Sequence, residues 1–73
     1  MMTNQINPIN LVELVINDEY VANALSILKE HNAMRIGKIP AFGVTLIQCE
    51  IAAADTPALL RDCANCGVDA YIR

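Results

Sequence analysis

The chain has 73 residues, of which 55% are hydrophobic and 18% charged, and its formal net charge is −3. This length allows one domain with a single small core. The hydrophobic content excludes an intrinsically disordered chain, and the low Gly and Pro counts exclude a collagen-like or low-complexity chain. The negative charge and the absence of Trp argue against nucleic-acid binding, which depends on cations and stacking side chains.

The excess of apolar residues over charged ones predicts self-association. A core this small cannot take all the apolar side chains, and the surplus stays on the surface, where apolar patches usually mark interfaces. Chains of this size often need a disulfide, a metal or a partner subunit for stability. The first residues resemble no signal peptide and no run is long enough to span a membrane, so we expect a cytoplasmic protein with reduced thiols.

In chain order, we expect a flexible segment over residues 1–10 and one domain over 11–73. Residues 11–16 are apolar, rich in β-branched side chains and bounded by Asn10 and Asn17, which favours a strand; a helix is the alternative for so short a run.

A helix follows, in which apolar residues recur with helical spacing from Val21 to Leu28. Asp18 is the expected N-cap and Asn32 the expected left-handed residue at the C-terminal end.

Three further elements complete the chain. A short strand is expected over residues 34–39, with Arg35 outward and Ile36 inward, and a turn over 40–43 leads to a strand over 44–51. Thr56 as N-cap and Pro57 at the first helical position open a second helix, and Gly67 ends it. The last strand covers residues 68–73.

The order strand, helix, strand, strand, helix, strand predicts an α+β, ferredoxin-like βαββαβ fold, a four-stranded antiparallel sheet with two helices on one face. The helix-covered face is expected to take Val12, Leu14, Ile16, Ile47, Cys49, Ile51, Val68, Ala70 and Ile72. The other face, here called the open face, is expected to carry Leu11, Glu13, Val15, Val44, Leu46, Asp69, Tyr71 and Arg73.

The open face is too apolar to remain in water, so it is the expected interface of a homodimer. The expected interface residues are Leu11, Val15, Val44, Leu46 and Tyr71. Glu13, Asp69 and Arg73 are expected at its rim. Pairing of strand edges into a continuous sheet is the competing arrangement.

Four segments carry a resemblance to a known family: Asn23–Glu30, Ile36–Pro40, Gly43–Ile47 and Gly67–Ala70. Over residues 11 to 73 the chain resembles small ACT-like regulatory domains, and among these the regulators associated with iron-only hydrogenase systems. It differs from many amino-acid-binding ACT domains at residues 17–19, which contain no glycine. The resemblance implies a ferredoxin-like fold, paired subunits and a regulatory role without catalysis.

Cys63 and Cys66 form a C-x-x-C pair, but at the end of a helix rather than at its start, where the helix dipole would activate a thiol. We interpret them as two small core residues facing the sheet; a redox or metal site is the alternative. A zinc site would need two more ligands, and Cys49 and His31 are not placed for one tetrahedron. His31 itself is interpreted as a solvated residue at a helix end. No cofactor and no metal are expected.

The basic residues concentrate in one stretch, at Lys29, His31, Arg35 and Lys38, and no Lys or Arg precedes it. They are either a weak site for an anion or an acidic partner, or a solvated edge that protects a strand from pairing. The carboxylates are dispersed and form no acid/base pair.

Together these patterns predict a non-catalytic regulatory or protein-interaction module that acts as a homodimer. Two alternatives remain open: a sensor of an anion or amino acid that binds at the subunit interface, and a small adaptor or inhibitor that docks on a larger protein.

Overall fold

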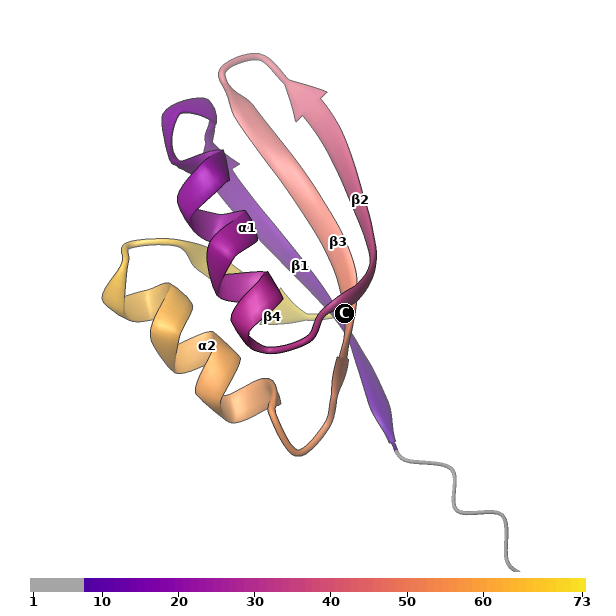
Figure 1. Cartoon of the computed structure of the whole chain (residues 1–73). Helices are drawn as coiled ribbons and strands as arrows, with labels where there is room; N and C mark the ends of the chain where they lie inside the picture. The colour runs from indigo at the N-terminus through magenta and orange to yellow at the C-terminus, as the bar shows by residue number, and fades with distance from the viewer. Residues whose placement is uncertain (1–7) are drawn as a thin grey trace, which may run out of the picture.

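The fold is the ferredoxin-like βαββαβ arrangement. The computed structural model describes residues 8–73 and contains, in order, β1 (Ile9–Asn17), a 3-10 turn η1 (Asp18–Tyr20), α1 (Val21–Glu30), β2 (Met34–Ala41), β3 (Val44–Ala52), α2 (Thr56–Asn65) and β4 (Asp69–Ile72). The strands form one antiparallel sheet in the order β2-β3-β1-β4 (Figure 1). The predicted fold class is therefore confirmed, and the helical alternative for residues 11–16 is wrong.

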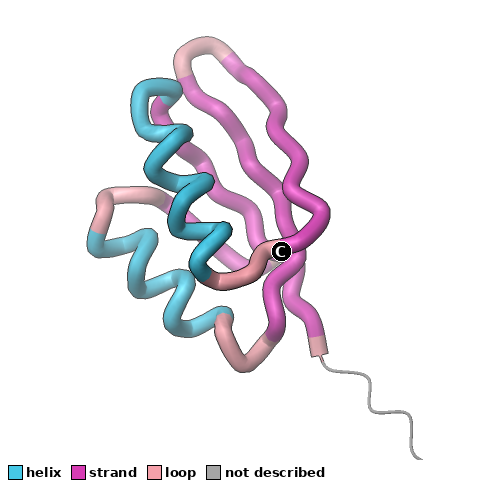
Figure 2. The backbone as a smooth tube through the Cα atoms, in the orientation of Figure 1, coloured by secondary structure: helices cyan, strands magenta, loops and turns pink. Residues whose placement is uncertain are grey.

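The core lies between the sheet and its two helices, which cover the same face (Figure 2). Side chains along β1 and β3 alternate strictly between buried and less buried, as expected for strands with one covered face. The predicted core positions of both strands are confirmed, and α1 and α2 add Ala24, Ile27, Leu28, Leu59 and Cys63. Ile72 is a correction: it shares the covered face with Val12 but is 51% exposed, because β4 is a short edge strand.

Both helices end in the way that the sequence predicts. Asn32, at φ 58°, follows α1, and the Ala33 N–H donates to the Leu28 carbonyl at 2.9 Å. Gly67, at φ 74°, follows α2, and the Val68 N–H donates to the Cys63 carbonyl at 2.8 Å. Each end is a Schellman motif, which satisfies carbonyls that the helix leaves unpaired.

The predicted N-caps are wrong at both helix starts. Asp18 lies in η1, three residues before α1, and its carboxylate accepts a hydrogen bond from the Thr45 hydroxyl at 2.8 Å. Thr56 is the first residue of α2; its hydroxyl donates to the Ala52 carbonyl at 3.0 Å and accepts from the Asn10 amide at 3.1 Å. Both polar side chains thus tie a helix start to the sheet.

The β2 strand departs from its prediction. It runs on through Pro40 to Ala41, and a bulge separates the pairs Met34↔Glu50 and Gly37↔Gln48. Arg35, in the bulge, has φ 53°. Ile36 is exposed rather than inward, because an edge strand lies beyond the cover of the helices. Of the predicted flexible segment, residues 1–7 lie outside the described part of the chain, and β1 begins at Ile9.

A substitution of Gly67 tests the left-handed helix end. We expect Gly67→Ala to lower the free energy of unfolding by about 1 kcal/mol, because an L-residue at positive φ is strained, although the added methyl meets no neighbour within 4 Å. Gly37→Ala is the matched control, since Gly37 has equal space and no positive φ. Urea denaturation measures both variants; equal losses would contradict this account.

Candidate functional site

The open face is the main uncovered apolar surface of the described chain. Among residues 8–73, nine large hydrophobic side chains are exposed, and register places five of them on this face. These five are Ile9, Leu11, Met34, Ile39 and Tyr71. Such a concentration is typical of an interaction surface rather than of scattered surface residues.

The structure places all five predicted interface residues on the open face. Leu11 and Tyr71 are exposed, whereas Val15, Val44 and Leu46 are half-buried between neighbouring strands. The pair Val15↔Leu46 lies in the central strands, so these two side chains form the middle of the face.

The prediction missed three apolar residues of this face. Ile9 was assigned to the flexible segment, and Met34 lies before a bulge that regular alternation does not reveal. Ile39 pairs with Leu46, so counting back across the β2–β3 turn would have found it.

Charged side chains surround the apolar residues in pairs within the chain. Arg35 faces Glu50 with 3.4 Å between Nε and Oε1, and Arg73 faces Glu13 at the same distance between the same atoms. Both arginines lie toward the end of the sheet where β2 begins, because Arg73 N–H donates to the Leu11 carbonyl and Leu11 pairs with Glu50. Asp69 pairs with Val15, four residues along β1 from the level of Leu11 and Arg73.

A hollow of about 150 Å³ lies at the arginine end of the open face. Leu11 supplies an apolar side chain, Arg35 and Arg73 flank the hollow, and Gln48 and Glu50 complete the wall. Val12 and Cys49 also border it, but their side chains are buried on the helix-covered face. Each guanidinium already faces a carboxylate, so the hollow has little net positive charge. It presents guanidinium groups beside an apolar side chain.

Tyr71 stands opposite Glu13 on this face. Desolvation raises the pKa of the Tyr71 phenol, and a hydrogen bond to the Glu13 carboxylate raises it further. The phenol therefore stays protonated at neutral pH and can act as a donor at the edge of an apolar surface.

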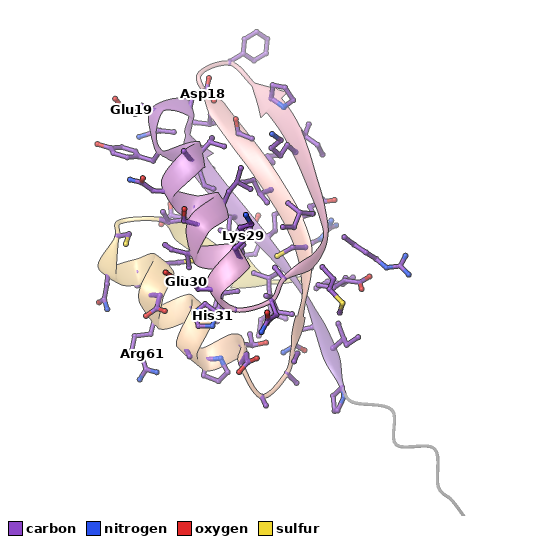
Figure 3. All side chains as sticks on the ribbon, viewed as in Figure 1. Asp18, Glu19, Lys29, Glu30, His31 and Arg61 are labelled. Carbon is purple, nitrogen blue, oxygen red and sulfur yellow. The ribbon has the colours of Figure 1, made fainter. Side chains whose placement is uncertain are left out.

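The predicted basic residues do not act as one free cationic patch. Arg35 pairs with Glu50 on the open face, whereas register puts Lys38, opposite Ile47, on the helix side of the edge strand. Lys29 lies in the last turn of α1, and Figure 3 shows it and His31 at that end of the molecule.

His31 holds the two helices together, so its interpretation as a solvated residue is wrong. Its side chain is only 15% exposed, and Nε2 lies 2.8 Å from Oδ2 of Asp62 in α2. The contact joins residues 31 positions apart in sequence, which no local pattern reveals. His31 is thereby removed from any anion site.

The C-x-x-C pair does not form one surface. Cys63 is fully buried in the core, as predicted, but Cys66 caps the end of α2 and is exposed. All three cysteines are free thiols. Burial, with smaller contributions from Cys66 and Asp62, raises the pKa of Cys63 to about 11, and burial also raises that of Cys49.

Thiol modification tests this difference. At pH 8 we expect a disulfide exchange reagent to modify one thiol of the native protein, Cys66, and all three after unfolding, because the other two are buried and protonated. Cys66→Ser removes the native reaction. Folding raises the pKa of Cys63 from its ordinary value of 9.0 to about 11. The free energy of unfolding therefore falls as the pH rises from 9.0 toward about 11. Rapid native reaction of two thiols would contradict the assignment.

Among residues 8–73, no cluster of three or more His, Cys, Asp or Glu side chains is arranged to hold a metal, and no helix is long and apolar enough to cross a membrane. Comparison of the sequence with known protein families gives no match, and comparison with curated proteins gives none either.

Proposed function

We propose that the protein is a non-catalytic regulatory or protein-interaction module that acts as a homodimer, with the open faces of two copies stacked on each other. The observation that carries the proposal is the apolar open face, which the chain's own helices cannot cover. The resemblance to ACT-like regulatory domains supports paired subunits, and three free thiols support a cytoplasmic location.

The apolar side chains of this face can offset the free-energy cost of bringing two copies together. Each contributes about 1.5–3 kcal/mol when it passes from full exposure to full burial. Two copies bring Leu11, Met34, Ile39 and Tyr71 twice, all roughly half exposed, together with the partly covered Val15 and Leu46. At half value the eight half-exposed side chains contribute about 6–12 kcal/mol, which is comparable to the association cost of about 4–15 kcal/mol.

The charges of the open face are compatible with a second copy of the same chain. A two-fold axis in the plane of the interface and across the strands reverses strand direction between the copies. Arg35 with Glu50 and Arg73 with Glu13 are already paired within each copy, so these four charges are compensated before two faces meet. These paired charges therefore do not oppose the stacking of two apolar faces.

Dimerisation through a strand edge is less well supported. The β2 edge contains Pro40, Lys38 and the bulge at Arg35, three features that block addition of another strand. The β4 edge offers only Asp69–Ile72. Neither edge presents a long, regular row of free backbone groups.

A sensor of an anion or amino acid is the second candidate, and the hollow between Arg35 and Arg73 is the observation that favours it. It ranks second because both guanidiniums already face carboxylates. A thermal-shift screen with phosphate and single amino acids tests it: a ligand at 100 times its Kd adds about 2.7 kcal/mol of stability. No shift with any of them removes this candidate.

The substitution Leu46→Asp tests the homodimer. A carboxylate in the middle of the open face would be buried without a partner in the stacked dimer, whereas in the monomer it is only half covered. We expect a folded monomer at concentrations where the unmodified chain is dimeric, measured by sedimentation velocity, with the fold checked by circular dichroism.

Ser26→Asp is the matched control, because Ser26 is exposed on α1 and adds the same charge away from the open face. It should leave the dimer intact. A Leu46→Asp protein that remains a dimer would favour a strand edge instead. An unmodified chain that is monomeric at high micromolar concentration would contradict both forms of dimer and favour an adaptor that docks on a larger protein.

A further inference from the structure

Phe42 has no contact that accounts for its place at the tip of the β2–β3 turn. The side chain is 108% exposed, and its backbone has φ 50°, followed by Gly43 at φ 89°. Two successive positive φ values are typical of a type I′ turn, whose first central position favours Asn, Asp or Gly. A bulky aromatic residue there is an outlier both in backbone conformation and in exposure.

The turn that carries Phe42 is held firmly to the rest of the fold. The Asp18 N–H donates to the Gly43 carbonyl at 3.1 Å, and the Thr45 hydroxyl donates to the Asp18 carboxylate at 2.8 Å. Figure 3 shows Asp18 at the same end of the molecule as this turn. The ring is therefore presented on an anchored support, which lowers the entropy lost on binding.

The hollow on the open face has the size and chemistry to receive an aromatic ring. An enclosed apolar cavity of about 150 Å³ holds one benzene molecule, and the hollow, which is open to solvent and partly lined by polar side chains, has a similar volume. The Leu11 side chain offers apolar contact, and Arg35 and Arg73 also line the hollow, where a guanidinium can stack on the face of a ring.

The stacked dimer brings the ring and the hollow together. The hollow lies at the level of Leu11↔Glu50 and the turn lies just beyond Asn17↔Val44, about 20 Å along the strands at 3.3 Å per residue. A two-fold axis that crosses the strands near Val15↔Leu46 lies midway between these two levels. Rotation about this axis places the β2–β3 turn of each copy over the hollow of the other copy, at the same position across the sheet.

We infer that Phe42 of each copy inserts into the hollow between Arg35 and Arg73 of the other. The inference rests on the proposed homodimer and names the residue that the second copy contributes. It also accounts for the strained turn, because in the dimer the ring exchanges full exposure for apolar and cation–π contacts.

The absence of Trp from the chain allows a direct test with three variants that each carry one indole. Phe42→Trp reports on the hollow, Tyr71→Trp on the open face, and Tyr20→Trp, away from that face, is the control. As protein concentration rises through the dimer transition, we expect the indoles of Phe42→Trp and Tyr71→Trp to shift to shorter emission wavelength and to resist acrylamide quenching. The indole of Tyr20→Trp should remain quenchable.

The outcomes separate the inference from the proposed function. A change in the Tyr71→Trp variant without a change in the Phe42→Trp variant overturns the inference and leaves the homodimer standing. No change in the Tyr71→Trp variant overturns the stacked dimer, and the inference with it. A change in both variants supports the two together.

Phe42→Asn gives a second, independent test. Because Asn suits the turn, the variant should melt at the same or a higher temperature when both proteins are compared as monomers, while its dimer dissociation constant rises at least tenfold. Arg35→Ala should weaken the dimer of the unmodified chain but have little effect in the Phe42→Asn background. A dissociation constant that Phe42→Asn leaves unchanged overturns the inference.

Discussion

Each of the two helices connects a pair of parallel strands, β1 to β2 and β3 to β4, that lie on either side of a third strand. Such crossovers are right-handed, so both helices must pack on the same face. That face is filled: the core side chains of β1 and β3 are almost completely buried. No segment of the described chain remains to cover the other face, yet Leu11, Ile39 and Tyr71 lie on it. The proposed homodimer therefore rests on an apolar sheet face that no segment of the described chain covers, and not on any catalytic group.

The features that sequence could predict are those set by local chemistry. The helix ends at Asn32 and Gly67 need a residue that tolerates positive φ, and each stands where the apolar spacing stops. The helix starts were missed for the opposite reason. Thr56 and Asp18 have the side chains of N-caps, but partners 46 and 27 residues away in sequence, Asn10 and Thr45, take their hydrogen bonds. Helix-capping propensity depends only on neighbouring residues, so it cannot reveal that a distant residue takes the hydrogen bond instead.

The residues of the candidate site also fall into two groups: those that local sequence patterns predict and those that they miss. Strict alternation places Leu11, Val15 and Leu46 on one face, which is enough to predict an apolar surface. The residues that give this surface its particular shape depend on a bulge and on long-range pairing. A regular strand would put Met34 and Ile39 on opposite faces, and the extra residue at Arg35 puts both on the open face. Helical spacing alone also predicted that Cys66 faces the core. Cys66 is instead the C-cap residue of α2, where the helical repeat ends.

The two strained residues outside the helix ends, Arg35 and Phe42, stand near the two ends of β2. A strand needs neither for its own pairing, and local rules that a sequence breaks are most often broken at functional positions. In the proposed dimer both residues contribute to the interface. The bulge brings Arg35 to the hollow and blocks pairing at the β2 edge. The turn directs Phe42 toward the other copy. A dimer paired through the β2 edge would have to remove the bulge, and pairing through the β4 edge would leave Phe42 in water. The backbone of β2 is therefore better suited to a partner stacked on the open face than to one added beside it.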